Sequence, residues 1–91
     1  MCTSEDLVAY AENLAEGNAL TVRRLGQYAD YDVSVLAVAV SRARDSRIYY
    51  ESLSDQRAWA SAVRRWKGVH QALIMALGDA QDRAYQNRAT A

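Results

Sequence analysis

An apolar stripe near the C-terminus constrains the fold of this chain more than any other feature. Its members alternate at spacings of four and three residues: Trp59, Val63, Trp66, His70, Leu73, Leu77, Ala80 and Ala84. This spacing puts one narrow seam along a helix, a pattern typical of a helix that packs lengthwise against another helix. We therefore expect one long helix from Asp55 to Ala84, capped by Ser52 or Ser54.

The preceding part of the chain predicts shorter helices. There is no proline to interrupt them, and the β-branched run from Val33 to Val40 continues a helical period, apolar around most of its circumference. Such a segment is expected in the centre of a bundle or in an interface. The expected N-caps are Thr3 or Ser4, then Asn18 or Thr21, then Asp32. The sequence thus predicts an all-α protein, a small bundle of three to four helices with a long C-terminal helix, in one domain over residues 1–91.

The expected length of the last helix raises a question of oligomeric state. A helix of about thirty residues is ~45 Å long, whereas a compact monomer of this size is only ~30 Å across. Either Gly78, followed by Asp79 as a new cap, breaks the helix, or a second copy covers the overhanging seam. Because Ala80 and Ala84 continue the register past Gly78, we expect a homodimer.

The charges balance overall but are unevenly distributed. Eleven basic residues face eleven acidic ones, and the acids dominate residues 1–32 while the bases dominate residues 33–68. This asymmetry fits an ordinary solvated surface of mixed charge. It also suits head-to-tail association or an acidic partner. The lone Cys2 excludes an internal disulfide, and no signal peptide or membrane-spanning run is evident, so we expect a cytoplasmic protein.

No group of residues has the spacing of a catalytic or metal site. His70 has no Glu or Cys three or four residues away, and the acid pairs Glu12/Glu16 and Asp79/Asp82 have no recognisable ligand-bearing helix opposite them. Glycine-rich phosphate loops and Ser–His–Asp order are missing. We therefore expect no enzyme activity, no cofactor and no metal.

The segment from Leu20 to Arg42 resembles the helix-turn-helix of DNA-binding regulators. Leu25 and Gly26 match the apolar and small positions of the first helix, and Ala29, Tyr31 and Leu36 match the apolar positions around the turn and on the second helix; Asp30 stands where the family usually has glycine. The resemblance implies DNA recognition by the second helix. Its exposed positions would include Asp32, Val33 and Val38, which read base edges poorly.

Two functions follow as hypotheses. The first is a non-catalytic interaction module, a small regulatory or adaptor protein that docks on a protein partner and whose size and arginine use suit a phage or mobile element. Its expected anchors are Trp59, Trp66, Leu77, Tyr49 and Tyr50. The second is a DNA-binding transcriptional regulator that dimerises through its C-terminal helix. Its expected nucleic-acid contacts are Arg23, Arg24, Arg42, Arg44, Arg47, Arg64, Arg65 and Lys67.

Overall fold

The computed structural model describes residues 2–53 and 56–90, with side chains for 2–53 and 60–89. The described residues form helices and no strand, in the order α1 (Ser4–Glu16), α2 (Val22–Tyr28), α3 (Val33–Glu51) and α4 (Gln56–Thr90). The predicted all-α bundle with a long C-terminal helix is confirmed. The expected cap Ser54 lies outside the described residues.

The first three helices begin where the sequence places a capping side chain. Thr3 accepts a hydrogen bond from the Asp6 backbone N–H at 3.1 Å, and the Asp6 side chain accepts one from the Thr3 N–H at 3.5 Å. The Thr21 side chain accepts a hydrogen bond from the Arg24 N–H at 3.2 Å and caps α2; the Asp32 side chain accepts one from the Ser34 N–H at 2.9 Å and caps α3. These bonds satisfy N–H groups that have no partner within the helix. Local chemistry thus fixes the start of α1, α2 and α3.

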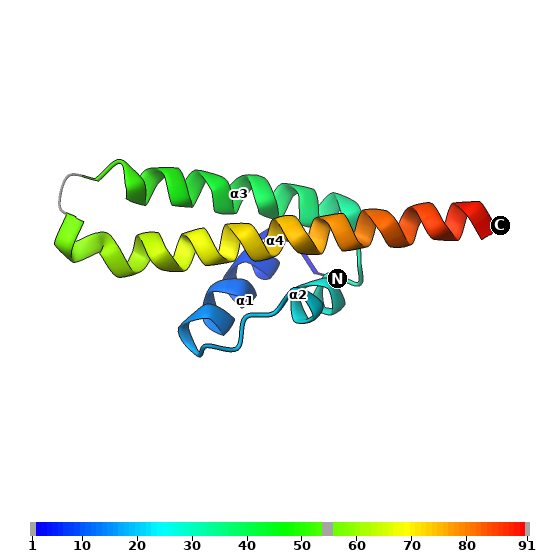
Figure 1. Ribbon diagram of the computed structural model, residues 1–91, viewed down its shortest axis with the longest axis horizontal. Helices are drawn as coiled ribbons and strands as arrows, with labels where there is room; N and C mark the ends of the chain where they lie inside the picture. The colour runs from blue at the N-terminus through cyan, green and yellow to red at the C-terminus, as the bar shows by residue number, and fades with distance from the viewer. Residues whose placement is uncertain (1, 54–55, 91) are drawn as a thin grey trace.

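The architecture is an antiparallel hairpin of α3 and α4 with one side covered by α1 and α2 (Figure 1). The core lies where these layers meet. Its fully buried large side chains are Leu7, Leu25, Leu36, Val69 and Leu73. Small residues dominate the rest of the core: Ala11, Ala29, Ala39, Ala43, Ala62, Ala76 and Ala80. Such small side chains let the helices approach closely. Because α1 and α2 both pack on the same side, the other side of the hairpin is uncovered.

The buried seam of α4 differs from the predicted one in register. Its members are Ala62, Trp66, Val69, Leu73, Ala76 and Ala80. Trp66, Leu73 and Ala80 were predicted, but Val63, His70 and Leu77 are only half-buried, and the side chain of Trp59 lies outside the described residues. The predicted and the observed heptad registers share the three correct positions. They differ at the positions between, where the observed register buries smaller residues. The seam packs inside the single chain.

One other expectation about helix packing needs correction, and the structure decides between the two alternatives that the sequence left open at Gly78. The first half of α3 is not buried all round, because Val38 is 47% exposed in the single chain. Gly78 does not break α4, which runs continuously for 35 residues. The molecule is accordingly elongated, 53 × 23 × 20 Å, and the C-terminal end of α4 projects beyond the other helices (Figure 1).

This projecting arm, residues 84–90, does not carry the wet apolar seam that suggested a homodimer. Side chains 85–89 are all exposed, Ala84 is half-buried, and the one large apolar residue is Tyr85, 71% exposed. The seam itself ends at Ala80, inside the bundle. Within the described part of the chain, no helix has the length and apolar character to cross a membrane.

Candidate docking surface

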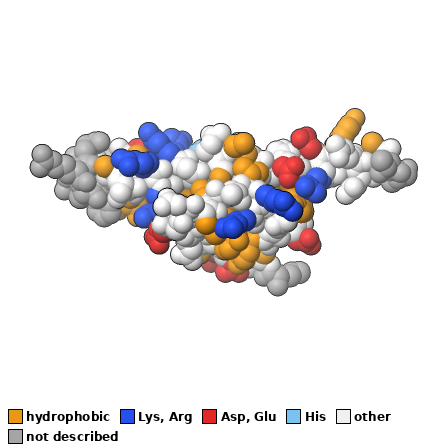
Figure 2. Space-filling model, turned by 60° about the horizontal axis from the view of Figure 1, so that its bottom comes forward, with side chains coloured by type: hydrophobic (Ala, Val, Ile, Leu, Met, Phe, Trp, Pro, Cys, Tyr) orange, Lys and Arg blue, Asp and Glu red, His pale blue; other side chains and the backbone are white. Residues whose placement is uncertain are grey.

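The predicted basic residues of α3 and α4 divide between the two sides of the hairpin. On the covered side, the Arg42 Nη1 lies 3.6 Å from the Oε1 of Glu5 in α1. Arg65 lies 3.9 and 3.5 Å from Glu12 and Glu16 of the same helix. The acidic first third of the chain therefore neutralises part of the basic middle within one molecule. Figure 2 shows the result: basic and acidic side chains are interspersed on the α1–α2 side, around a central hydrophobic area.

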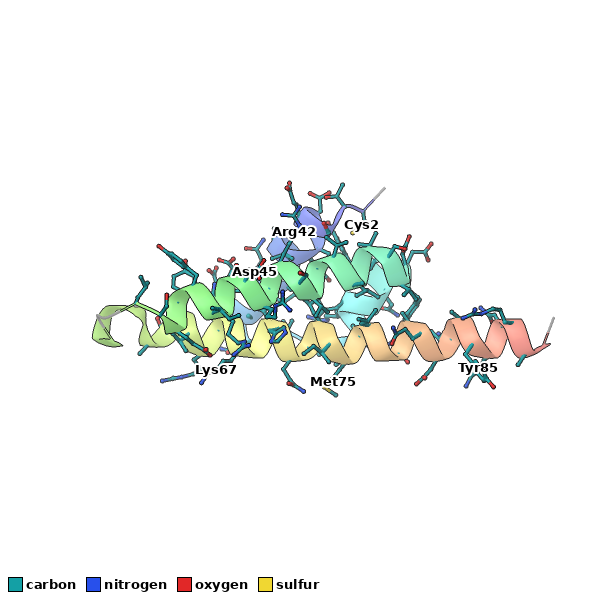
Figure 3. The ribbon with its side chains drawn as sticks, turned by 90° about the horizontal axis from the view of Figure 1, so that it is seen from above. Cys2, Arg42, Asp45, Lys67, Met75 and Tyr85 are labelled. Atoms are coloured by element: carbon teal, nitrogen blue, oxygen red, sulfur yellow. The ribbon has the colours of Figure 1, made fainter. Side chains whose placement is uncertain are left out.

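On the uncovered side, two helical stripes lie next to each other. The α3 stripe is Val40, Arg44, Arg47 and Glu51; the α4 stripe is Lys67, His70, Ile74 and Leu77. Spacings of three and four residues keep each stripe on one side of its helix. We call these eight residues the open face. Figure 3 looks onto this side of the hairpin, with α1 and α2 behind it.

Ion pairs and the position of the histidine join the two stripes. Glu51 accepts hydrogen bonds from Arg47 (3.1 Å to Oε1) and lies 4.0 Å from the Lys67 Nζ. Burial lowers the pKa of His70, and the positive charges of Arg47 and then Arg44 lower it further, while Glu51 acts in the opposite direction. The basic end of the open face is thus built from both helices.

An apolar patch occupies the other end of the open face. Val40 precedes Glu51 by eleven residues and Leu77 follows Lys67 by ten, so the antiparallel direction brings Val40 and Leu77 to the same level. Both are half-buried, and Ile74 beside them is 41% exposed. Ile74 and Val40 were not among the expected anchors. Their spacing of three or four residues from His70, Leu77 and Arg44 could have placed them on the same sides of their helices.

The three predicted aromatic anchors whose side chains are described do not form one exposed surface. Trp66 is only 6% exposed and packs in the core, its ring centroid 6.5 Å from that of the half-buried Tyr50. In this conformation Trp66 cannot anchor a partner. Its Nε1 is buried without a hydrogen-bond partner. Tyr49 is 59% exposed and contacts Tyr50 edge-on. Among the predicted anchors with described side chains, only Leu77 belongs to the open face.

The remaining predicted arginines lie elsewhere. Arg23 and Arg24 are exposed on α2, and Arg24 donates a hydrogen bond to the Ala19 carbonyl at 3.2 Å. Arg64 is exposed on α4 in a groove of about 570 Å³ against the α1–α2 connection. A second groove of about 770 Å³ separates α2 from α4, with Arg23 on its rim. The eight predicted basic residues therefore do not form one continuous surface.

The segment that resembles a helix-turn-helix forms the corner between α2 and α3. Leu25, Gly26, Ala29 and Leu36 are buried, and Asp30 and Tyr31 have positive φ angles of 52° and 53°. Asp tolerates this left-handed conformation, which the family usually gives to glycine. The Tyr31 N–H donates to the Gly26 carbonyl at 2.8 Å, which closes the turn.

In comparisons with known proteins, no family model, no curated protein and no solved structure matches the chain significantly.

Proposed function

We propose that this chain is a non-catalytic interaction module that docks on a protein partner through its open face. The observation that carries the proposal is the apolar patch of Val40, Ile74 and Leu77, which lies on the same face as the cations Arg44 and Lys67. Protein interfaces combine an apolar centre with a polar rim and favour arginine. Helices α1 and α2 pack against the other side of the hairpin, so the patch is already formed in the folded chain.

The test is affinity capture with wild-type chain and two variants. Ile74→Asp places a charge in the patch, whereas Val38→Asp places one at a position of similar exposure, 47% against 41%, outside the open face. We expect wild type and Val38→Asp to retain the same partner and Ile74→Asp to lose it, by at least about tenfold in affinity. Equal capture by both variants would place the docking surface elsewhere.

A homodimer remains a prediction for the same surface. If a second copy occupies the open face, sedimentation will show wild type as a dimer and Ile74→Asp as a monomer. If wild type sediments as a monomer at concentrations well above the partner affinity, the surface is free for a different protein.

A second candidate function is DNA binding, and the turn at Asp30 and Tyr31 is the observation in its favour. Against it, Arg42 and Arg47 are paired with carboxylates, and the outer positions of α3 include Ala37 and Val38. Anisotropy of a labelled duplex decides the matter, because phosphate contacts lose affinity steeply as salt rises. Salt-sensitive binding that disappears when Arg42, Arg44 and Arg47 are all changed to Ala would establish this function.

A further inference from the structure

The molecule already contains one example of what its hairpin binds. Helix α1 is acidic and amphipathic: it buries Leu7 and Ala11 and directs Glu5, Glu12 and Glu16 to arginines of α3 and α4. The apolar side chains supply most of the attraction by leaving water, and the carboxylates fix position and direction through charge. The covered side of the hairpin is therefore a receptor for an acidic amphipathic helix, supplied by the same chain.

The open face repeats this chemistry without an occupant in the described chain. Its patch of Val40, Ile74 and Leu77 corresponds to the apolar strip under α1, and Arg44 and Lys67 correspond to the paired arginines. Lys67 retains 61% and Arg44 54% side-chain exposure, although Glu51 and Asp45 lie close enough to pair with them. Both cations are therefore accessible to carboxylates of a partner.

We propose that the open face binds an acidic amphipathic helix of a protein partner, with the apolar side chains of that helix on the Ile74 patch and its carboxylates on Arg44 and Lys67. This inference rests on the proposed function and specifies the chemistry of the partner. A helix fits because the patch and the cations lie in line along the boundary between α3 and α4, on stripes whose residues recur every three or four positions. A nucleic-acid backbone fits less well, since its phosphates would meet the carboxylates of Glu51 and Asp45 and gain nothing from the patch.

The probes are three designed helical peptides that share one leucine stripe and differ only at the flanking positions, which are Glu, Gln or Lys. Each labelled peptide is titrated with the full chain at low and moderate salt. We expect the Glu peptide to bind at least tenfold tighter than the Gln peptide at low salt and the Lys peptide not to bind. Two further probes, a labelled DNA duplex and vesicles of anionic phospholipid, are expected not to bind.

Matched variants locate the binding surface. Lys67→Glu should weaken the Glu peptide at least tenfold, whereas Arg64→Glu, three residues away on the same helix but in the groove against the α1–α2 connection, should change affinity less than twofold. His70 is the single histidine of the chain, so its imidazole NMR signal reports directly on the open face. Carboxylates bound beside it should raise its pKa.

The outcomes separate this inference from the proposed function. Equal binding of the Gln, Lys and Glu peptides would overturn the acidic partner and leave apolar docking in place. Failure of all three peptides would also overturn it, and the function would then be judged by capture with Ile74→Asp. Equal weakening by Arg64→Glu and Lys67→Glu, or tighter binding to duplex or vesicles than to the Glu peptide, would reject the open face as a helix receptor.

Discussion

Gly26 and Gly78 both lie within helices, but Gly26 is tightly packed whereas the space beside Gly78 is open. A Cβ at position 26 would lie 2.7 Å from the ring of Tyr31, whereas a Cβ at position 78 would meet nothing within 4 Å. Tyr31 has little freedom to move, because its backbone closes the α2–α3 turn and the Arg83 guanidinium stacks on its ring at 3.9 Å. Glycine at position 26 thus makes room for the Tyr31 ring. Glycine at position 78 has no such role, and it makes α4 less stable than alanine would.

This difference predicts opposite effects of one substitution. Gly26→Ala should lower the free energy of unfolding by about 1–2 kcal/mol through overpacking. Gly78→Ala should raise it by up to about 1 kcal/mol through helix propensity. Urea denaturation of both variants measures these changes, and a stabilised Gly26→Ala would show that the Tyr31 ring moves aside.

His70 should make stability depend on pH. Its folded-state pKa is lowered from the ordinary value of 6.5, mainly by burial and then by Arg47 and Arg44. The unfolded chain therefore binds the proton more readily than the folded chain. The contribution of neutral His70 to the free energy of unfolding should be complete above pH 6.5, and it should be lost as the pH falls from 6.5 through the folded-state pKa. NMR titration should give a pKa below 6.5, and Arg44→Gln should raise it. A value at or above 6.5 in the wild type would contradict this account.

At the scale of elements, the sequence predicts where helices begin more reliably than which residues they bury. Thr3, Thr21 and Asp32 act within a few residues of themselves, so their capping roles are visible locally. The seam of α4 depends on partners that are distant in sequence. Val69 and Ala76 replace His70 and Leu77 in the core because α1 and α2 approach from one side. For the same reason, the pairing of Arg42 and Arg65 with α1 could not be read from their positions.

The corrected seam can be tested with two leucines one helical turn apart. Leu73 is fully buried and Leu77 half-buried at the edge of the open face. Leu73→Ala should therefore cost about 2–5 kcal/mol of stability, and Leu77→Ala clearly less, since part of its surface already meets water. Chemical denaturation compares them; a larger loss for Leu77→Ala would restore the predicted register.

At the scale of the whole molecule, the projecting arm is expected to contribute little to the stability of the bundle. Residues 85–89 are exposed, so they bury no side chain in the core, and most helical stability in proteins comes from such burial. The expectation that the end of α4 needs a second copy arose from the length of the helix and from the apolar register that Ala80 and Ala84 continue. Neither observation says how polar residues 85–89 are.

Removing residues 85–91 should consequently change the melting temperature very little. Thermal unfolding by circular dichroism would show the same midpoint with a smaller helical signal. A drop of more than a few degrees would mean that the arm is stabilised by contacts, for example with a second copy, and a dependence of that drop on protein concentration would identify the copy.

The way α1 is held has a consequence for the dynamics of the chain. Within α1 only Leu7 and Ala11 are buried, and its ion pairs are partly solvated, so its local opening should require less free energy than global unfolding. Its amide hydrogens should then exchange with solvent before those at the centres of α3 and α4. Each such opening frees Arg42 and Arg65 and turns the hairpin, for a moment, into a two-sided receptor. An acidic helix from another protein would compete with α1 for the vacated side, so that binding there would have the kinetics of exchange with an internal ligand.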